Sequence, residues 1–542
     1  MPWPRLSVNV LPLLITVSPL IGVATTIAVS RWNKAMVRPM AVSNSTFTLF
    51  LIAMAIWLPP AGDGEGLREV STNLPGFEWL TETAANPQGS EPSGIRVRMD
   101  WWLNGLSTWT AAIVGLTVWA VLCCPNELAG ESFASNCGKL LSCQALLFAS
   151  TFSSDGIAAI VFLEMSVVPI YLIIGRHGDG NRRQVAGGWW MWQLSGCTCS
   201  LLGVTLLAVS QPWMQAEFVT VRQGLFFDTP LLTQGIQQLL NRSETALHIW
   251  SNVRPWGSAL MLLGLLIRLP TFPVQGWYQS TLMSAPAGIA AVIAAAFPLA
   301  AFGGWLRLGM PLFGFHSGTM NGALAVAALV GLLYASIAAQ SQTDLKQLLV
   351  LISCAMLCVA GIGLSFRNVD GVRAAWLMML SQGLSIPCGL LLVQSMEARL
   401  GTRELTRLSS LVSTSPRLAI LLELLLLGWT GVPVLAGFTA IYQQLAGASS
   451  IGLWLILGES IGLVALAAAG LRAFSHVWSW SPASSLESSK PVPPSPLDSS
   501  SRELVALFPF IVLLILVNAV PMYFLPAVDA TIPSRHRSSH QP

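Results

Sequence analysis

Charge is the scarcest property of this 542-residue sequence, in which only 10% of the residues are Asp, Glu, Lys or Arg while 53% are hydrophobic. Soluble domains typically carry about 25% charged residues. The shortage of charge therefore excludes a disordered chain and argues against a soluble globular protein. The net charge is +3, and no basic stripe with interleaved aromatic residues is present, so nucleic acid is also excluded as a partner.

The nine cysteines do not form a disulfide framework. They lie mostly within or beside apolar runs, as Cys197, Cys199, Cys354 and Cys358 illustrate. No histidine stands near them to complete a metal-ligand set. Because a free buried cysteine usually behaves as a small hydrophobic residue, the sequence predicts no metal site.

Long apolar runs are what the sequence has in abundance. A transmembrane helix needs about 20 mostly apolar residues, whereas barrel strands would alternate over about 10. The fold class predicted is therefore an all-α polytopic membrane protein with about 14 transmembrane helices. The N-terminus lacks the Arg- and Ser-rich pattern of a transit peptide, so we expect insertion where the chain is made. The predicted helices lie at 9–30, 45–61, 101–123, 137–153, 155–175, 187–211, 257–277, 284–307, 319–338, 347–365, 373–395, 416–442, 451–471 and 504–525.

Basic residues cluster in three short loops, at 31–38, 176–183 and 399–407, each of which follows an odd-numbered apolar run. Loops after odd-numbered helices share one face of the membrane. The positive-inside rule then places these loops on the cytoplasmic or matrix side and both termini opposite. Two longer segments, 62–99 and 476–503, are predicted outside the membrane, and the second has the Ser- and Pro-rich composition of a flexible linker.

Two ionisable side chains are predicted near the middle of the bilayer, where a charge costs about 2.5–3.5 kcal/mol. Glu164 lies nine residues after Asp155, and Arg268 lies eleven residues after Gly257. At ~1.5 Å per residue, both reach roughly mid-depth. Opposite charges at one depth can pair and offset each other's desolvation. The pair is either functional or a static link between two helices, and the sequence leaves both open.

Proline interrupts two of the predicted helices. Arg268 opens the sequence Arg268-Leu-Pro-Thr-Phe-Pro273, and the segment from Gly431 to Phe438 interrupts the run at 416–442. Broken helices in corresponding places predict an internally repeated transporter fold, whose freed backbone groups line a polar cavity. Ordinary proline kinks are the alternative.

Glu423 and Glu459 are also predicted within the membrane. Glu423 lies about 10 Å in from the basic face, and Glu459 lies at a similar depth from the opposite face. Each is a candidate proton-relay carboxylate. Each could equally bond a neighbouring helix or face a shallow water-filled cleft.

The ordered motifs of the sequence resemble those of a known family. The motifs are Asn104-Gly-Leu-Ser107, the run Ile160–Gly178 with Glu164 five residues before Pro169, Leu266-Ile-Arg268-Leu-Pro270 with Trp277 and Ala285-Pro286, Gln342-Thr-Asp-Leu-Lys346, Gln382-Gly-Leu, Gly401-Thr-Arg403, and Gly431-Val-Pro433 with Gly437-Phe438. This set resembles chain 4 of NADH–ubiquinone oxidoreductase (respiratory complex I), an antiporter-like proton-translocating membrane subunit. The motifs span roughly residues 100 to 440.

The resemblance implies two inverted five-helix repeats with broken helices seven and twelve. It also implies that Glu164 and Arg268 belong to a proton path driven electrostatically by quinone chemistry elsewhere in the complex. Flavin, iron–sulfur clusters and ubiquinone would belong to other subunits, with no cofactor in this chain. The implied units are the N-terminal helices at 1–136, the first repeat at 137–307, the second repeat at 308–475, the loop at 476–503, and the C-terminal helix and tail at 504–542.

The sequence departs from the family at most positions expected to exchange protons. Arg268 stands where the family has a lysine, and arginine stays charged and exchanges protons poorly. We expect Glu164 and Arg268 to survive as an electrostatic or structural pair while pumping through this subunit is weakened or lost. Rerouting through Glu423 and Glu459 is the competing hypothesis. The other departures are Leu299 or Pro298 for a helix-eight lysine, Met356 and Gln382 for histidines on helices ten and eleven, and Ile441 for a helix-twelve glutamate.

The expected function is that of a membrane-arm subunit of a proton-translocating NADH:ubiquinone reductase, partly structural because its proton path is degenerate. The alternative is a subunit of a multi-subunit cation/proton antiporter or of a membrane-bound hydrogenase. Expected partners are other membrane-arm subunits, including neighbouring antiporter-like chains, and membrane lipids. The expected location is the mitochondrial inner membrane, with a bacterial plasma membrane as the alternative.

Overall fold

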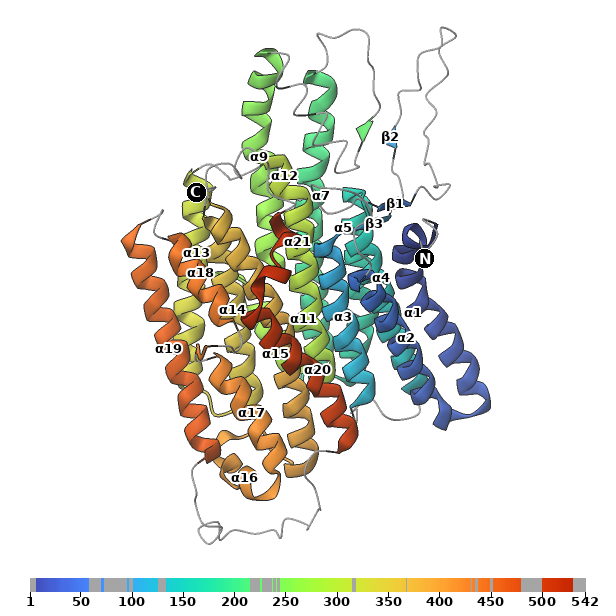
Figure 1. Ribbon diagram of the computed structural model, residues 1–542. Helices are drawn as coiled ribbons and strands as arrows, with labels where there is room; N and C mark the ends of the chain where they lie inside the picture. The colour runs from blue at the N-terminus through green and yellow to red at the C-terminus, as the bar shows by residue number, and fades with distance from the viewer. Residues whose placement is uncertain are drawn as a thin grey trace.

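The structure, a computed structural model, is a bundle of helices that run mostly side by side (Figure 1). It describes residues 6–57, 70–72, 95–96, 101–124, 133–214, 225–226, 236, 240, 244–313, 318–366, 368–429, 431–433, 437–448, 452–478 and 500–529.

The first half of the bundle is built from long helices joined by short turns. Two of these helices end early and continue after a short gap, α5 into α6 and α9 into α10. The elements are α1 (Leu6–Trp32), η1 (Lys34–Met36), α2 (Val37–Trp57), α3 (Gly105–Cys123), α4 (Phe133–Phe152), α5 (Gly156–Met165), α6 (Val167–His177), α7 (Arg182–Met214), α9 (Glu244–Arg268), α10 (Gly276–Ser284), α11 (Ala287–Gly304), the π-turn η2 (Trp305–Gly309) and α12 (Met310–Phe313).

The second half is likewise built from long helices joined by short turns. Its interrupted helix is α17, which continues as α18. The elements are α13 (Gly318–Gln340), α14 (Leu345–Ser365), α15 (Val369–Leu400), η3 (Leu405–Ser410), α16 (Leu411–Thr414), α17 (Pro416–Trp429), α18 (Phe438–Ala448), α19 (Leu453–Trp478), α20 (Ser501–Ala519), η5 (Pro521–Tyr523) and α21 (Pro526–Asp529).

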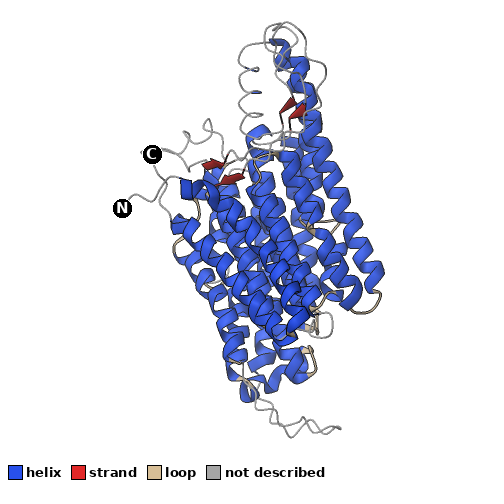
Figure 2. Cartoon of the chain, turned by 90° about the vertical axis from the view of Figure 1, so that its right-hand side faces the viewer, coloured by secondary structure: helices blue, strands red, loops and turns tan. Residues whose placement is uncertain are grey.

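Four short strands lie toward one end of the bundle, beside the ends of the helices (Figure 2). β1 (Val70–Thr72) pairs antiparallel with β3 (Trp101–Leu103), and β2 (Ile95–Arg96) pairs parallel with β4 (Leu225–Phe226). The all-α membrane fold is therefore confirmed, with short strands outside the bundle. The described parts of the segment 62–99 lie there, and its position outside the membrane stays a prediction. Most of the segment 476–503 falls outside the described residues.

Eleven helices in the described part of the chain are long and apolar enough to cross a membrane. The other three predicted spans fall on α4, on the α9–α10 pair and on the α17–α18 pair. The count of 14 helices and the inverted repeats stay predictions. Both predicted helix breaks, by contrast, are confirmed.

Several predicted boundaries were wrong by more than a turn. The predicted span 257–277 begins at Glu244 in the structure, because α9 packs beside α7 along its length and both extend past the neighbouring helices (Figure 1). The predicted span 45–61 begins at Val37 and ends at Trp57, since η1 turns the chain directly into α2. Packing against a partner helix thus extends a helix beyond its most apolar stretch.

The bundle is elongated, with α14 and α15 near its centre and α1, α2 and α19 toward its two ends (Figure 1). The most apolar stretches of α14 and α15 are wholly buried by other helices. The end helices instead expose large apolar side chains such as Leu20, Phe50 and Ile461. The central helices therefore form the core in which buried polar groups have to be explained.

The three basic loops share one end of the bundle, as predicted. The loop between α1 and α2 and the loop between α15 and α16 lie at the lower end in Figure 1. The loop after α6 is joined to the last turn of α10 by the Asp179 N–H, which donates to the Ser284 carbonyl at 2.8 Å. Lys346, at the start of α14, donates to the adjacent Ala285 carbonyl at 2.7 Å.

Candidate functional site

Glu164 lies at the end of a short helix in the first half of the bundle. Asp155 caps the start of α5 by accepting a hydrogen bond from the Ala158 N–H at 2.9 Å. The helix ends at Met165, and Ser166 links it to α6. This arrangement fixes Glu164 one residue before a helix end, within the bundle.

Arg268 is the last residue of α9, immediately before the proline-rich break. The break leaves backbone groups of α9 without helical partners. The indole N–H of Trp277, from α10, donates to the Ile267 carbonyl at 3.1 Å and satisfies one of them. The tryptophan therefore joins the two halves of the broken helix next to Arg268.

Glu164 and Arg268 meet inside the bundle. A guanidinium N–H of Arg268 donates to a carboxylate oxygen of Glu164 at 3.2 Å, and their side chains are 5% and 14% exposed. The second carboxylate oxygen of Glu164 and the Nε of Arg268 are buried and have no partner within the described residues. The structure thus brings together Glu164 and Arg268, as their equal predicted depth suggested. One hydrogen bond joins them, and each side chain keeps a polar atom that could form another.

Small residues on α7 allow Arg268 to reach this position. A Cβ atom at Gly196 would lie 3.2 Å from the Cγ of Arg268, and one at Gly264 would lie 2.7 Å from the Gly196 carbonyl oxygen. α7 and α9 therefore touch backbone to backbone, which is the usual role of small residues between membrane helices. Cys197, next on α7, also lies against the guanidinium. No sequence pattern predicted this role for the glycines.

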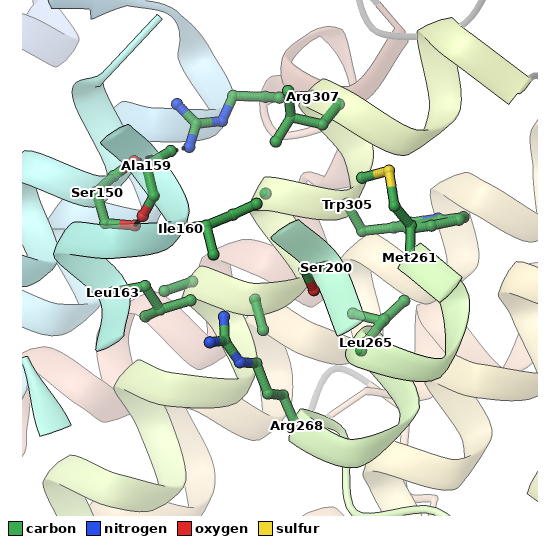
Figure 3. Close-up of a pocket in the computed structure, with 15 residues that line it drawn as sticks. Ser150, Ala159, Ile160, Leu163, Ser200, Met261, Leu265, Arg268, Trp305 and Arg307 are labelled. Carbon is green, nitrogen blue, oxygen red and sulfur yellow. Dashed lines mark hydrogen bonds between the residues drawn. The ribbon is translucent and has the colours of Figure 1, made fainter. Parts of the chain in front are cut away.

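A small cavity separates Arg268 from a second buried arginine, Arg307 (Figure 3). Its volume is about 40 Å³, and because one water needs about 10–15 Å³, it has room for about three waters. Figure 3 shows the two arginines on opposite sides of the cavity, with Ile160 and Leu163 between them along one wall. The Arg268 side of the ion pair therefore borders a space that can hold water.

Arg307 was missed by the sequence analysis. It lies on the π-turn η2, is 7% exposed, and donates to the carbonyls of Ser150 at 3.0 Å, of Ser153 at 3.3 Å and of Thr151. These carbonyls belong to the C-terminal end of α4, where a cation is favourable. A π-turn is often found at functional positions, but the sequence offers no signal for one here.

A neutral hydrogen-bonded chain occupies the middle of the bundle. The Tyr278 hydroxyl of α10 lies 2.6 Å from the Ser353 hydroxyl of α14. The Gln382 amide of α15 donates to Ser353 at 3.1 Å and to the Ala294 carbonyl of α11 at 3.0 Å. All three side chains are fully buried. The central helices are thus linked by hydroxyl and amide groups that carry no charge.

Glu423 and Glu459 lie apart from the first ion pair, on α17 and α19. Glu423 is 8% exposed and Glu459 is 0% exposed. Neither forms a salt bridge within the described residues, and Glu459 has no hydrogen-bond partner there for either carboxylate oxygen. The amide of Gln444, on α18, is near enough to interact with Glu459. The structure therefore gives these two carboxylates different surroundings from that of Glu164.

The cysteines form no disulfide in the structure, and all nine are free. The described residues contain no group of three or more His, Cys, Asp or Glu side chains placed to hold a metal ion.

Together, apolar spanning helices, two helix breaks and a buried ion pair at the first break define a polytopic membrane protein of the broken-helix transporter class. A family described as "NADH:quinone oxidoreductase/Mrp antiporter, TM" matches residues 153–466, more than half of the chain. The chain belongs to this family. The matched region includes Glu164, Arg268, Glu423 and Glu459, as well as both helix breaks.

Known proteins with related sequences are subunits of respiratory complexes. NADH-quinone oxidoreductase subunit M of Rhodobacter capsulatus is 25% identical over 344 residues, 62% of this chain and 63% of that protein. NADH-ubiquinone oxidoreductase chain 4 of Prototheca wickerhamii is 22% identical over 456 residues, 84% of this chain and 82% of that protein. The chain thus spans just under two thirds of the length of the bacterial relative.

A chain of the structure titled respiratory complex I from Thermus thermophilus with bound NADH has the same fold. Its TM-score is 0.75 at 21% sequence identity, over 96% of this chain and 98% of that chain. The match extends the shared fold well beyond residues 153–466 of the family match.

Proposed function

We propose that this chain is an antiporter-like membrane-arm subunit of a respiratory NADH:quinone oxidoreductase, and that it couples electron transfer to proton translocation. The observation that carries the proposal is the Glu164–Arg268 ion pair at a helix break, within the segment that matches the family. Charges at this depth are costly and mark ion paths in membrane proteins. The names of the relatives support the same assignment.

In this proposal the ion pair is an electrostatic element rather than a proton carrier. Arg268 keeps its charge at working pH and exchanges protons poorly. A proton wire needs groups that gain and lose protons near working pH, and Tyr278, Ser353 and Gln382 in the centre are neutral side chains. The central path is therefore degenerate, and the subunit is partly structural within its complex.

The alternative is a subunit of a stand-alone cation/proton antiporter or of a membrane-bound hydrogenase, and the family description itself includes Mrp antiporters. Both named relatives, however, are parts of NADH dehydrogenases. This favours the respiratory complex.

The partners proposed are other membrane-arm subunits, including neighbouring antiporter-like chains, and lipids that cover the exposed apolar side chains of the end helices. Flavin, iron–sulfur clusters and ubiquinone are assigned to other subunits, and none to this chain. We propose the mitochondrial inner membrane as its location, and a bacterial plasma membrane is the alternative.

The test is gentle detergent extraction of native membranes, separation on a native gel, and mass spectrometry of the band that stains for NADH dehydrogenase. We expect this chain in a large band that also reduces quinone. Its presence in a smaller complex without that activity, together with a sodium requirement, would favour the antiporter instead.

A further inference from the structure

Glu459 is a fully buried carboxylate of the second half of the bundle. Its helix, α19, packs against α13, α14, α17 and α18. Two glycines near it allow α19 to pack closely on α13. A Cβ at Gly458 would lie 2.8 Å from the Leu329 side chain, and one at Gly462 would lie 2.7 Å from the Leu332 side chain. Glu459 is 0% exposed, and neither oxygen has a hydrogen-bond partner within the described residues.

One neutral amide is the polar neighbour of this carboxyl group. Gln444 is itself fully buried, and its amide donates to the Val359 carbonyl of α14 at 2.8 Å. Gln444 interacts with Glu459, and no charged group of the described residues does so. The ionisable side chains on the elements packed against α19 are Tyr334, Lys346, Cys354, Cys358, Arg407, Arg417, Glu423 and Tyr442, and its own last turns carry Arg472 and His476.

An ionised carboxylate in such surroundings is strongly disfavoured. Burying an unpaired charge costs far more than burying a neutral acid, so the group keeps its proton instead. Glu164 is the opposite case, because the Arg268 guanidinium lies 3.2 Å away and stabilises its negative charge. Glu164 thus has a cationic partner, whereas Glu459 has a neutral amide as its polar neighbour.

We propose that Glu459 is a protonated, proton-holding carboxyl group of the second repeat, and that it exchanges its proton with the aqueous face at which α19 begins. Glu459 lies six residues after Leu453, the start of α19, which is about 9 Å along the helix. Its polar neighbour Gln444 belongs to α18, the second helix of the broken pair α17–α18. The exchange role rests on the proposed function, whereas the protonation state does not.

The protonation state is tested with a membrane-permeant carbodiimide on native membranes, followed by peptide mass spectrometry. The acid O–H adds across a C=N bond of the reagent: the carboxyl oxygen bonds to carbon, the proton moves to nitrogen, and the adduct rearranges to a stable N-acylurea. We expect Glu459 to be labelled and Glu164 to stay unlabelled. Glu459→Gln should remove the label from its peptide.

The matched control is Arg268→Gln, which removes the cation from Glu164 and should make that carboxyl reactive. It shows whether the reagent reaches a buried acid at all. Labelled Glu164 in Arg268→Gln membranes, with Glu459 unlabelled in the same sample, would overturn the proposal.

The exchange role is tested by the number of protons pumped per NADH oxidised in sealed vesicles. We expect a lower ratio in Glu459→Gln and a partly restored ratio in Glu459→Asp, which keeps the carboxyl group. An unchanged ratio in Glu459→Gln would overturn the exchange role. If the chain instead runs apart from NADH dehydrogenase activity while Glu459 is labelled, the proposed function fails and the proton-holding site stands.

Discussion

Arg268 ends α9, and its guanidinium donates at 3.2 Å to the carboxylate of Glu164, which lies where α5 continues into α6. A cation is favourable at a helix C-terminus and an anion is not. Arg268 is thus stabilised twice, by its own helix and by Glu164, whereas Glu164 depends on Arg268. This asymmetry, together with the cavity beside the pair, leads to predictions about what each side chain contributes.

We expect Glu164→Gln to destabilise the protein by about 3–5 kcal/mol, because it leaves the Arg268 charge buried and unpaired. Arg268→Gln should destabilise the protein less, because Glu164 can then take up a proton and become neutral. The double variant should be less destabilised than the sum of the two. Thermal unfolding in detergent measures all three variants as a double-mutant cycle. Strictly additive effects would mean that the two side chains are not energetically coupled.

Close packing of α7 on α9 should be sensitive to a single methyl group. Gly264→Ala places a Cβ about 2.7 Å from the Gly196 carbonyl oxygen, and we expect overpacking to cost about 1–3 kcal/mol. Gly188→Ala, on α7 with nothing within 4 Å, is the control. It should leave the unfolding temperature unchanged or raise it, since alanine is favoured over glycine in helices. Equal effects of the two substitutions would contradict the packing argument.

Arg307 should be a structural cation at the end of α4. Arg307→Gln removes charged hydrogen bonds to three carbonyls, each worth about 1.5–3 kcal/mol, so we expect a marked drop in unfolding temperature. Arg307→Lys keeps the charge but not the planar fork, and its unfolding temperature should lie between those of the wild type and Arg307→Gln. A wild-type unfolding temperature for Arg307→Gln would show that the contacts contribute nothing.

The central chain should stabilise the bundle without carrying protons. Tyr278→Phe and Ser353→Ala should each cost about 0.5–1.5 kcal/mol, and less than additively together, because they remove the same 2.6 Å contact. We expect the number of protons pumped per NADH to match the wild type. A lowered ratio in Tyr278→Phe would instead show that the hydroxyl belongs to a working proton path.

Much of this site could be predicted from the sequence, because depth in a membrane helix follows from residue count. Residue count placed Glu164 and Arg268 at one depth, and the prolines after Arg268 predicted the helix break. The hydrogen bonds of Arg307 could not be predicted. They depend on a π-turn and on the end of α4, which lies over 150 residues earlier in the chain.

The sequence by itself determined that this is a helical membrane protein, because the lengths of its apolar runs leave few other structures that satisfy the backbone in lipid. It also predicted which carboxyl groups lie along the apolar runs, Glu164, Glu423 and Glu459. Only the tertiary structure decided that Glu164 has a cationic partner and that Glu459 faces one neutral amide. Residue spacing fixes the depth of a side chain, but the rotation and packing of whole helices decide which groups meet at that depth.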